Sequence, residues 1–174
     1  MVARGLWQAM AMCGFLAACA GYGGSGLVPG AARIDDVLRV MGRPAMEWTE
    51  ADGSRRLAYP RGPMGVHTYM ALAGPDGRLK SIENVLEAGH FSRIAAGMGK
   101  AEVLKTLGPP APGWTVYFPA RDELVWEWRY CDDWNRLARF EVLFDGSREV
   151  VRSTMSLREE QVGSCTQDGC ACAR

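Results

Sequence analysis

The chain has 174 residues, which suffices for one ordinary domain or two small ones. Hydrophobic residues make up 48% and charged residues 23%, so the chain is too apolar to be disordered. The 20 Lys and Arg are balanced by 20 Asp and Glu, and a chain without a basic excess is not typical of nucleic-acid binding.

The amino terminus predicts an export signal over residues 1–18. One positive charge is followed by an uncharged apolar stretch and then by small residues. The apolar stretch is shorter than the ~20 residues that cross a membrane. Leu16-Ala17-Ala18-Cys19 resembles the lipobox of bacterial lipoproteins, in which the Cys is acylated and becomes the first residue. The resemblance implies lipidation at Cys19; an ordinary secretory signal is the alternative.

Residues 19–30 are rich in glycine and predict a flexible tether between this anchor and a folded body. Several acyl chains would make a stable membrane anchor. No Asp follows Cys19, and resemblance to other lipoproteins then implies the periplasmic face of the outer membrane.

The body predicts two tandem units, over residues 31–88 and 89–160. Residues 37–44 align with residues 103–110, and Trp48 and Trp114 share the same spacing of 66 positions. Each unit begins with a short amphipathic helix, followed by Gly42 or Gly108 and then a Pro. We expect these glycines to form left-handed helix caps. The expected apolar stripes are Ile34, Val37, Leu38 and Met41 in the first unit, and Ile94, Met98, Ala101, Leu104 and Leu107 in the second.

Strand patterns follow each helix. In residues 125–130 the alternation places Trp126, Trp128 and Tyr130 on one face of a strand. We therefore expect an α+β fold of two tandem units, each a short helix packed on a three-stranded antiparallel meander. The expected strands are 56–59, 67–72 and 79–85, then 125–130, 139–144 and 150–155.

Residues 97–110, together with Trp126-Glu127-Trp128-Arg129-Tyr130 and Val142-Leu143-Phe144-Asp145-Gly146, resemble the signature of the BamE/SmpA/OmlA lipoprotein domain. The resemblance implies a non-enzymatic envelope protein that contacts other proteins, such as a β-barrel assembly complex of the outer membrane. The tandem arrangement also resembles secreted β-lactamase-inhibitor proteins, which implies a concave surface formed by two sheets.

Four cysteines remain once Cys13 leaves with the signal and Cys19 carries lipid: Cys131, Cys165, Cys170 and Cys172. An exported chain favours two disulfides. Cys170 and Cys172 are too close in sequence to pair easily. We therefore expect Cys131 to pair with the tail (residues 161–174), and Cys165 to pair with Cys170 or Cys172. A thiolate metal site is the alternative, although the spacing of the tail cysteines is not a standard zinc pattern.

Known catalytic motifs are missing from the sequence, and we expect neither an enzyme nor a cofactor. His67 and His90 are the only histidines, and we expect structural or surface roles for both. A deep pocket holding either beside a carboxylate would favour an enzyme instead. We expect the acidic pairs Asp122-Glu123 and Asp132-Asp133 in solvated loops.

The second unit is dense in aromatic residues, and some of them must face solvent on alternating strands. Trp and Tyr are favoured at protein interfaces. We expect a partner surface formed by Trp126, Trp128 and Trp134. The leading hypothesis is a lipid-anchored interaction module of the cell envelope, and the alternatives are an inhibitor of a periplasmic or secreted enzyme and metal handling by the tail cysteines.

Overall fold

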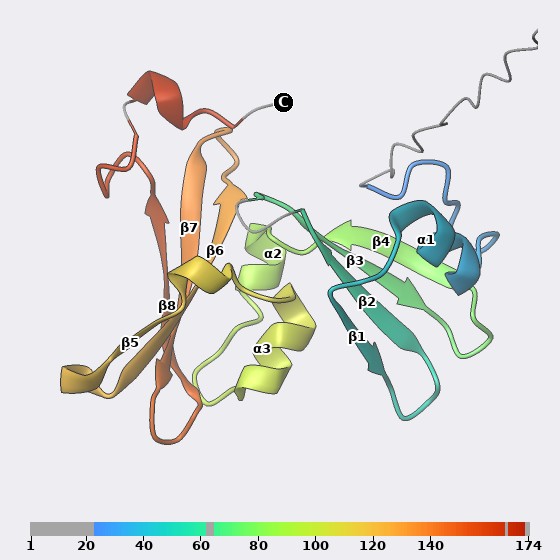
Figure 1. Cartoon of the computed structure of the whole chain (residues 1–174), viewed down its shortest axis with the longest axis horizontal. Coiled ribbons are helices and arrows are strands. Elements are labelled where there is room, and N and C mark those ends of the chain that lie inside the picture. Colours follow the sequence, from blue (N-terminus) through green and yellow to red (C-terminus); the bar gives the residue numbers. More distant parts are fainter. Residues whose placement is uncertain (1–22, 62–64, 166, 173–174) are drawn as a thin grey trace, which may run out of the picture.

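The computed structural model describes residues 23–61, 65–165 and 167–172. The expected signal and Cys19 lie outside these residues. The fold is α+β, with two four-stranded antiparallel sheets and a few short helices (Figure 1). The α-helices are α1 (Ile34–Met41), α2 (Ala88–Phe91) and α3 (Lys100–Leu107), and the 3-10 turns are η1 (Pro112–Trp114), η2 (Pro119–Arg121) and η3 (Gln167–Cys170).

Each sheet is a meander in which consecutive strands are neighbours. Sheet 1 contains β1 (Met46–Thr49), β2 (Arg55–Pro60), β3 (Thr68–Ala73) and β4 (Leu79–Asn84). Sheet 2 contains β5 (Val116–Phe118), β6 (Glu123–Cys131), β7 (Leu137–Asp145) and β8 (Val151–Arg158).

The expected three-stranded meanders are thus incomplete, because β1 and β5 each add a fourth strand. These strands have 4 and 3 residues and lie at sheet edges. Such short segments carry too few alternations to stand out in a sequence.

The two units repeat one arrangement of backbone bonds. In each unit the backbone N–H at the start of the helix donates to an acidic side chain three residues on, at 2.8 Å, to Asp36 in α1 and to Glu102 in α3. In each, the first residue of the fourth strand also donates to the segment before the helix. Leu79 N donates to Ala32 O at 2.9 Å, and Val151 N donates to Met98 O at 2.8 Å.

Gly42 and Gly108 end the two helices, but not in the left-handed conformation that we expected. Their φ values are +80° and +74°, while their ψ values of −159° and −173° are extended. This region of backbone space is essentially restricted to glycine. The backbone N–H of each still donates to the carbonyl four residues earlier, Leu38 O or Leu104 O.

The expected apolar stripe is confirmed for α1, where Ile34 and Val37 are buried. It is only partly confirmed for the second helix: Leu107 is buried as expected, but α3 begins only at Lys100, and Val103, which the expected stripe left out, is also buried. Ala101 is exposed.

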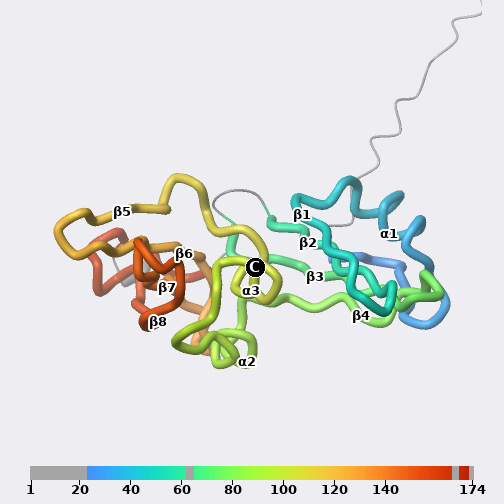
Figure 2. The backbone as a smooth tube through the Cα atoms, turned by 90° about the horizontal axis from the view of Figure 1, so that it is seen from below, coloured from blue at the N-terminus to red at the C-terminus, as the bar shows by residue number. Residues whose placement is uncertain are grey.

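The helices and sheets form alternating layers. α1 packs on one face of sheet 1, against Leu57 and Ala71. α3 lies between the two sheets (Figure 2), where Val103 and Leu107 share a core with Met70 of sheet 1. From sheet 2, Trp128, Phe140, Val142 and Phe144 join the same core. Sheet 1 is therefore covered on both faces, and sheet 2 on one.

The segment between the units belongs to this shared core. Leu86 and Phe91 are buried there, and the Phe91 ring stacks on that of Phe140 with centroids 4.1 Å apart. At the other end of the first unit, Leu27 packs on the sheet 1 core, and Gly30 N donates to Leu79 O at 2.8 Å. Residues 27–30, which we expected in the tether, are part of the folded body.

Two disulfides hold the tail, in agreement with the expected pairing. Cys131 at the end of β6 is bonded to Cys172, and Cys165 is bonded to Cys170. Cys172 N also donates to Asn135 O at 3.0 Å, in the β6–β7 turn. The tail is thereby attached to one end of sheet 2.

Candidate protein-binding face

The face of sheet 2 that points away from α3 is the open face of the fold. β7 shows how it arises, because its side chains alternate between the two sides of the sheet. Phe140, Val142 and Phe144 are buried on the α3 side. Arg139, Glu141 and Leu143 point the other way and are only half-buried.

Apolar side chains on this face remain accessible. Val116 is 43% exposed, Phe118 38% and Met155 43%, although all three are large and hydrophobic. They surround a shallow depression of about 590 Å³. The open face is defined by its lining: Gly113, Trp114, Val116, Phe118, Arg121, Glu123, Val125, Glu127, Arg139, Glu141, Leu143 and Met155.

A cluster of charges lies among these apolar residues. The Glu127 side chain is almost fully buried, and its Oε2 accepts from Arg139 Nη1 at 3.2 Å. Arg139 Nη2 donates to Glu159 Oε2 and to Ser164 Oγ, both at 2.8 Å. Arg129 Nε lies 2.8 Å from Glu159 Oε1. The shortest ion-pair contacts of both arginines are therefore with Glu159, and Glu127 receives only the longer contact from Arg139.

The pKa values of the two carboxyl groups follow this division. Burial raises the pKa of Glu127 more than the charge of Arg139 lowers it. Burial alone would also raise the pKa of Glu159, but hydrogen bonds from Arg139 and Ser164 and the charge of Arg129 hold it below its ordinary value. Of the two carboxylates, Glu127 is therefore the one whose negative charge is less well stabilised by neighbouring groups.

Trp114 closes one end of the cluster. The Arg129 guanidinium lies 4.1 Å from the centroid of its indole ring, and that of Arg139 lies 5.8 Å away. Such cation–π contacts hold a guanidinium over the ring face and leave its N–H groups available for hydrogen bonds. η1 positions Trp114 at this place, after the run of prolines that follows α3.

The three tryptophans expected at a partner surface occupy three different environments. Trp128 is 2% exposed and donates its indole N–H to Pro109 O at 3.1 Å, so it is a core residue and not an interface residue. Trp126 is half-buried on the same side and contacts Phe144. Trp134 is 76% exposed, but it lies in the β6–β7 turn, away from the open face.

The expectation that both acidic pairs lie in solvated loops is wrong for Glu123, which is the first residue of β6 and lies 2.9 Å from Arg121 Nη2. Asp122 and Asp132 organise turns. Asp122 accepts hydrogen bonds from Tyr117 and Ser147, and these bonds, from Ser147 first, lower its pKa. Asp132 accepts from the backbone of Trp134 and Arg136 and so holds the β6–β7 turn.

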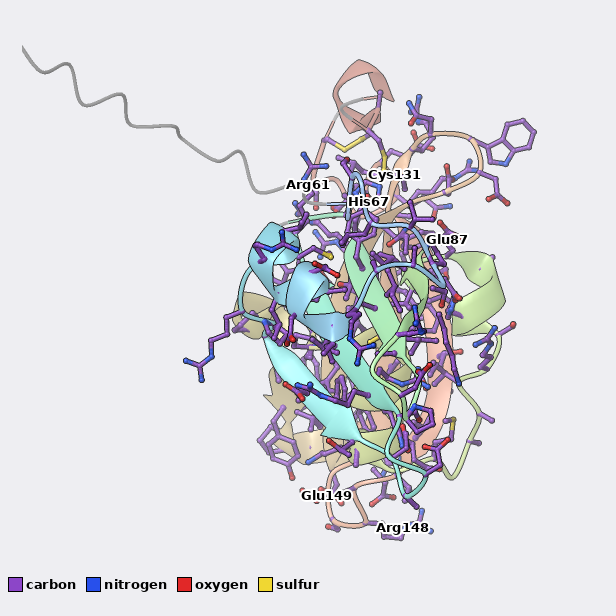
Figure 3. All side chains as sticks on the ribbon, turned by 90° about the vertical axis from the view of Figure 1, so that its right-hand side faces the viewer. Arg61, His67, Glu87, Cys131, Arg148 and Glu149 are labelled. Carbon is purple, nitrogen blue, oxygen red and sulfur yellow. A yellow bond between two sulfur atoms is a disulfide. The ribbon has the colours of Figure 1, made fainter. Side chains whose placement is uncertain are left out.

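His67 lies in a second, polar depression of about 430 Å³ beside Glu87, at the end of the molecule that carries Cys131 (Figure 3). Burial and the charge of Arg61 lower its pKa. His90 faces Glu83 at 3.4 Å instead. The described lining of this depression contains no Ser, no Thr and no free Cys. A histidine beside a carboxylate is thus present, and Tyr130, Asp132 and Asp133 line the same depression.

The concave surface expected between the units is filled by α2 and α3. What remains there is an apolar pocket of about 340 Å³, with Trp128, Leu86 and Pro109 in its walls.

The tail cysteines are all in disulfides, so they offer no thiolate to a metal in this state. Among residues 23–61, 65–165 and 167–172, no three metal-ligating side chains gather at one point. The helices of the same ranges are too short or too polar to span a membrane. The chain matches no family model, no curated protein and no solved structure.

Proposed function

We propose that this chain is a non-enzymatic module that binds another protein of the cell envelope through its open face. The observation that carries the proposal is the unequal covering of two otherwise similar sheets. Sheet 1 has no free face, whereas sheet 2 leaves Val116, Phe118 and Met155 in contact with solvent. Exposed apolar side chains that form one patch with polar residues at its rim are typical of protein interfaces.

The sequence features around the folded body support an envelope location. The lipobox-like segment ending at Cys19 supports lipid anchoring, with outer-membrane sorting as the lipoprotein resemblance implies. Two disulfides fit an oxidising compartment. The BamE/SmpA/OmlA resemblance of the second unit favours a partner in outer-membrane protein assembly, and it is in this unit that the open face lies.

Site-specific photo-crosslinking in the native host tests the binding surface. A photoreactive phenylalanine replaces Phe118 or Met155 on the open face, Trp134 in the β6–β7 turn, or Val28 in the first unit. All four side chains are exposed. We expect the same envelope protein to be crosslinked from Phe118 and Met155 and not from Val28. Adducts from Trp134 alone, or no adducts above the Val28 level, would overturn the assignment of the open face.

Lipid anchoring has its own test. The intact mass of the protein extracted from envelopes should correspond to a chain that starts at an acylated Cys19 and lacks four hydrogens for its two disulfides. The Cys19→Ala variant should be released from the membrane fraction. An unacylated wild-type chain would contradict the anchor and leave the binding face to be judged by the crosslinks.

A further inference from the structure

The open face carries two carboxylates directly opposite each other. In the register of β6 and β7, Glu127 pairs with Glu141. Side chains that face each other across antiparallel strands have Cβ atoms roughly 4.5–5.5 Å apart, and like charges at that distance destabilise a sheet. A pair of this kind needs a cation close by.

The chain supplies this pair with one close cation, Arg139, which Glu127 shares with Glu159. Glu127 Oε1 is buried and has no hydrogen-bond partner within the described ranges, while its other oxygen receives only the 3.2 Å bond from Arg139. Glu141 forms no ion pair with any described residue. The better hydrogen bonds of Arg139 go to Glu159 and Ser164. Glu127, which lines the depression, therefore has one buried carboxylate oxygen without a partner, although buried polar atoms normally have partners.

Apolar residues border the pair on one side, whereas on the other side Arg129 and Arg139 face each other two residues along the same strands. Val125 and Leu143 face each other two residues further along the same strands, and Met155 pairs with Glu141 from β8. Lys and Arg combine a long apolar stem with a cationic end, so one such side chain matches both parts of this surface.

We infer that the open face receives a Lys or Arg side chain of the partner protein, with its cation between Glu127 and Glu141 and its stem against Val125, Leu143 and Met155. The inference rests on the proposed function and states the chemistry of its partner. Charge-assisted hydrogen bonds to Glu127 Oε1 and to Glu141 supply the missing positive charge. Phe118 and Val116 then contact apolar residues next to the basic one.

A peptide selection tests this directly. The probe is a display library of random seven-residue peptides, selected on the mature, disulfide-bonded chain. We expect the enriched peptides to share a Lys or Arg with apolar neighbours. Their affinity should fall about tenfold on Glu141→Gln, because hydrogen bonds to a charged group contribute that much. Asp133→Asn is the control, since it removes one negative charge from an exposed residue that lies away from the open face, and it should change nothing.

The reversed charge gives the sharper result. Selection on Glu141→Lys should enrich acidic residues in place of basic ones, and Glu127→Gln should weaken the wild-type peptides like Glu141→Gln. Urea unfolding of each variant confirms that it is folded. Peptides that bind in a Phe118- and Met155-dependent way but lack a basic residue would overturn this inference and leave the proposed function standing. A library that yields no peptide with that dependence counts against both.

Discussion

The two sheets of this chain have the same topology and different surroundings. In each, the third strand carries a bulge near its end, before Ala73 in sheet 1 and before Phe144 in sheet 2. Counting back from that bulge makes Met70 the equivalent of Glu141. Met70 is 1% exposed and lies under α3, whereas Glu141 is on the open face.

The partners of these residues differ in the same way. Met70 is paired with Ala58 on β2, and Glu141 is paired with Glu127 on β6. α3 covers the first pair, and Gly108 at its end packs against Ala58. One fold thus supports an apolar pair where a helix covers the sheet and a charged pair where no helix of the described residues covers it. The difference shows that the helix of the second unit, and not the sheet topology, decides which face becomes core.

Removing the Cys131–Cys172 disulfide should have the largest effect on stability. The bond joins residues 41 positions apart, and loop entropy predicts a contribution of about 4 kcal/mol, against about 2 kcal/mol for Cys165–Cys170 with a separation of 5. Urea unfolding of Cys131→Ala/Cys172→Ala and of Cys165→Ala/Cys170→Ala measures both. Equal losses would mean that the tail is not held to sheet 2 by the longer link.

The comparison of the sheets is tested most directly by Met70→Ala and Glu141→Ala. Met70→Ala should cost about 3 kcal/mol of unfolding free energy, because it leaves a cavity under α3. Glu141→Ala should change it by less than about 0.5 kcal/mol, as is usual for surface sites. Denaturant unfolding of the two variants measures both changes in unfolding free energy. A loss of several kcal/mol for Glu141→Ala would show that the open face is covered in the folded protein.

The two helix caps should respond unequally to the same substitution. Alanine at Gly42 meets no neighbour and should cost about 1 kcal/mol for its positive φ. Alanine at Gly108 would also place its Cβ 2.8 Å from the Thr68 methyl group, so the loss should reach about 2–3 kcal/mol. Thermal unfolding of both variants tests the order. The opposite order would place the end of α3 away from sheet 1.

The smallest effect concerns pH. Arg148 holds the pKa of Asp145 well below its ordinary value, with help from Arg152. A lowered pKa in the folded state stabilises the fold above the ordinary Asp value, and this stability is lost as the pH falls below about 4. Asp145→Asn should therefore be less stable than the wild type at pH 7 and lose less on acidification. Unfolding between pH 2 and pH 7 measures the slopes, and parallel slopes would contradict this assignment.

Much of the fold follows from periodicity in the sequence. The six long strands and the helix of the first unit alternate or repeat clearly enough to be placed within a few residues. β1 and β5 could not be predicted, because an edge strand of three or four residues buries too few side chains to produce a recognisable alternation of apolar and polar residues. The start of α3 was misplaced because Ile94 and Met98, which continue the apolar spacing, lie in the loop before it.

The candidate site was harder to predict. Alternation placed Trp126 and Trp128 on one face of β6, and the structure has them together on the α3 side. Which side faces a partner depends on where α3 lies, and no local pattern contains that information. The open face could have been predicted from the residues between the aromatic ones, because Glu127 and Arg129 alternate with Trp126, Trp128 and Tyr130 and so must lie on the opposite face of the strand.

The position of α3 also constrains how the chain folds as it is made. Sheet 1 is fully synthesised at Asn84, yet its inner face gains its cover only when Leu107 has emerged. Until then Met70 and Leu72 are exposed, and neighbouring chains can reach them. The first unit therefore completes its core with a helix encoded after it, so folding of the two units is coupled during synthesis.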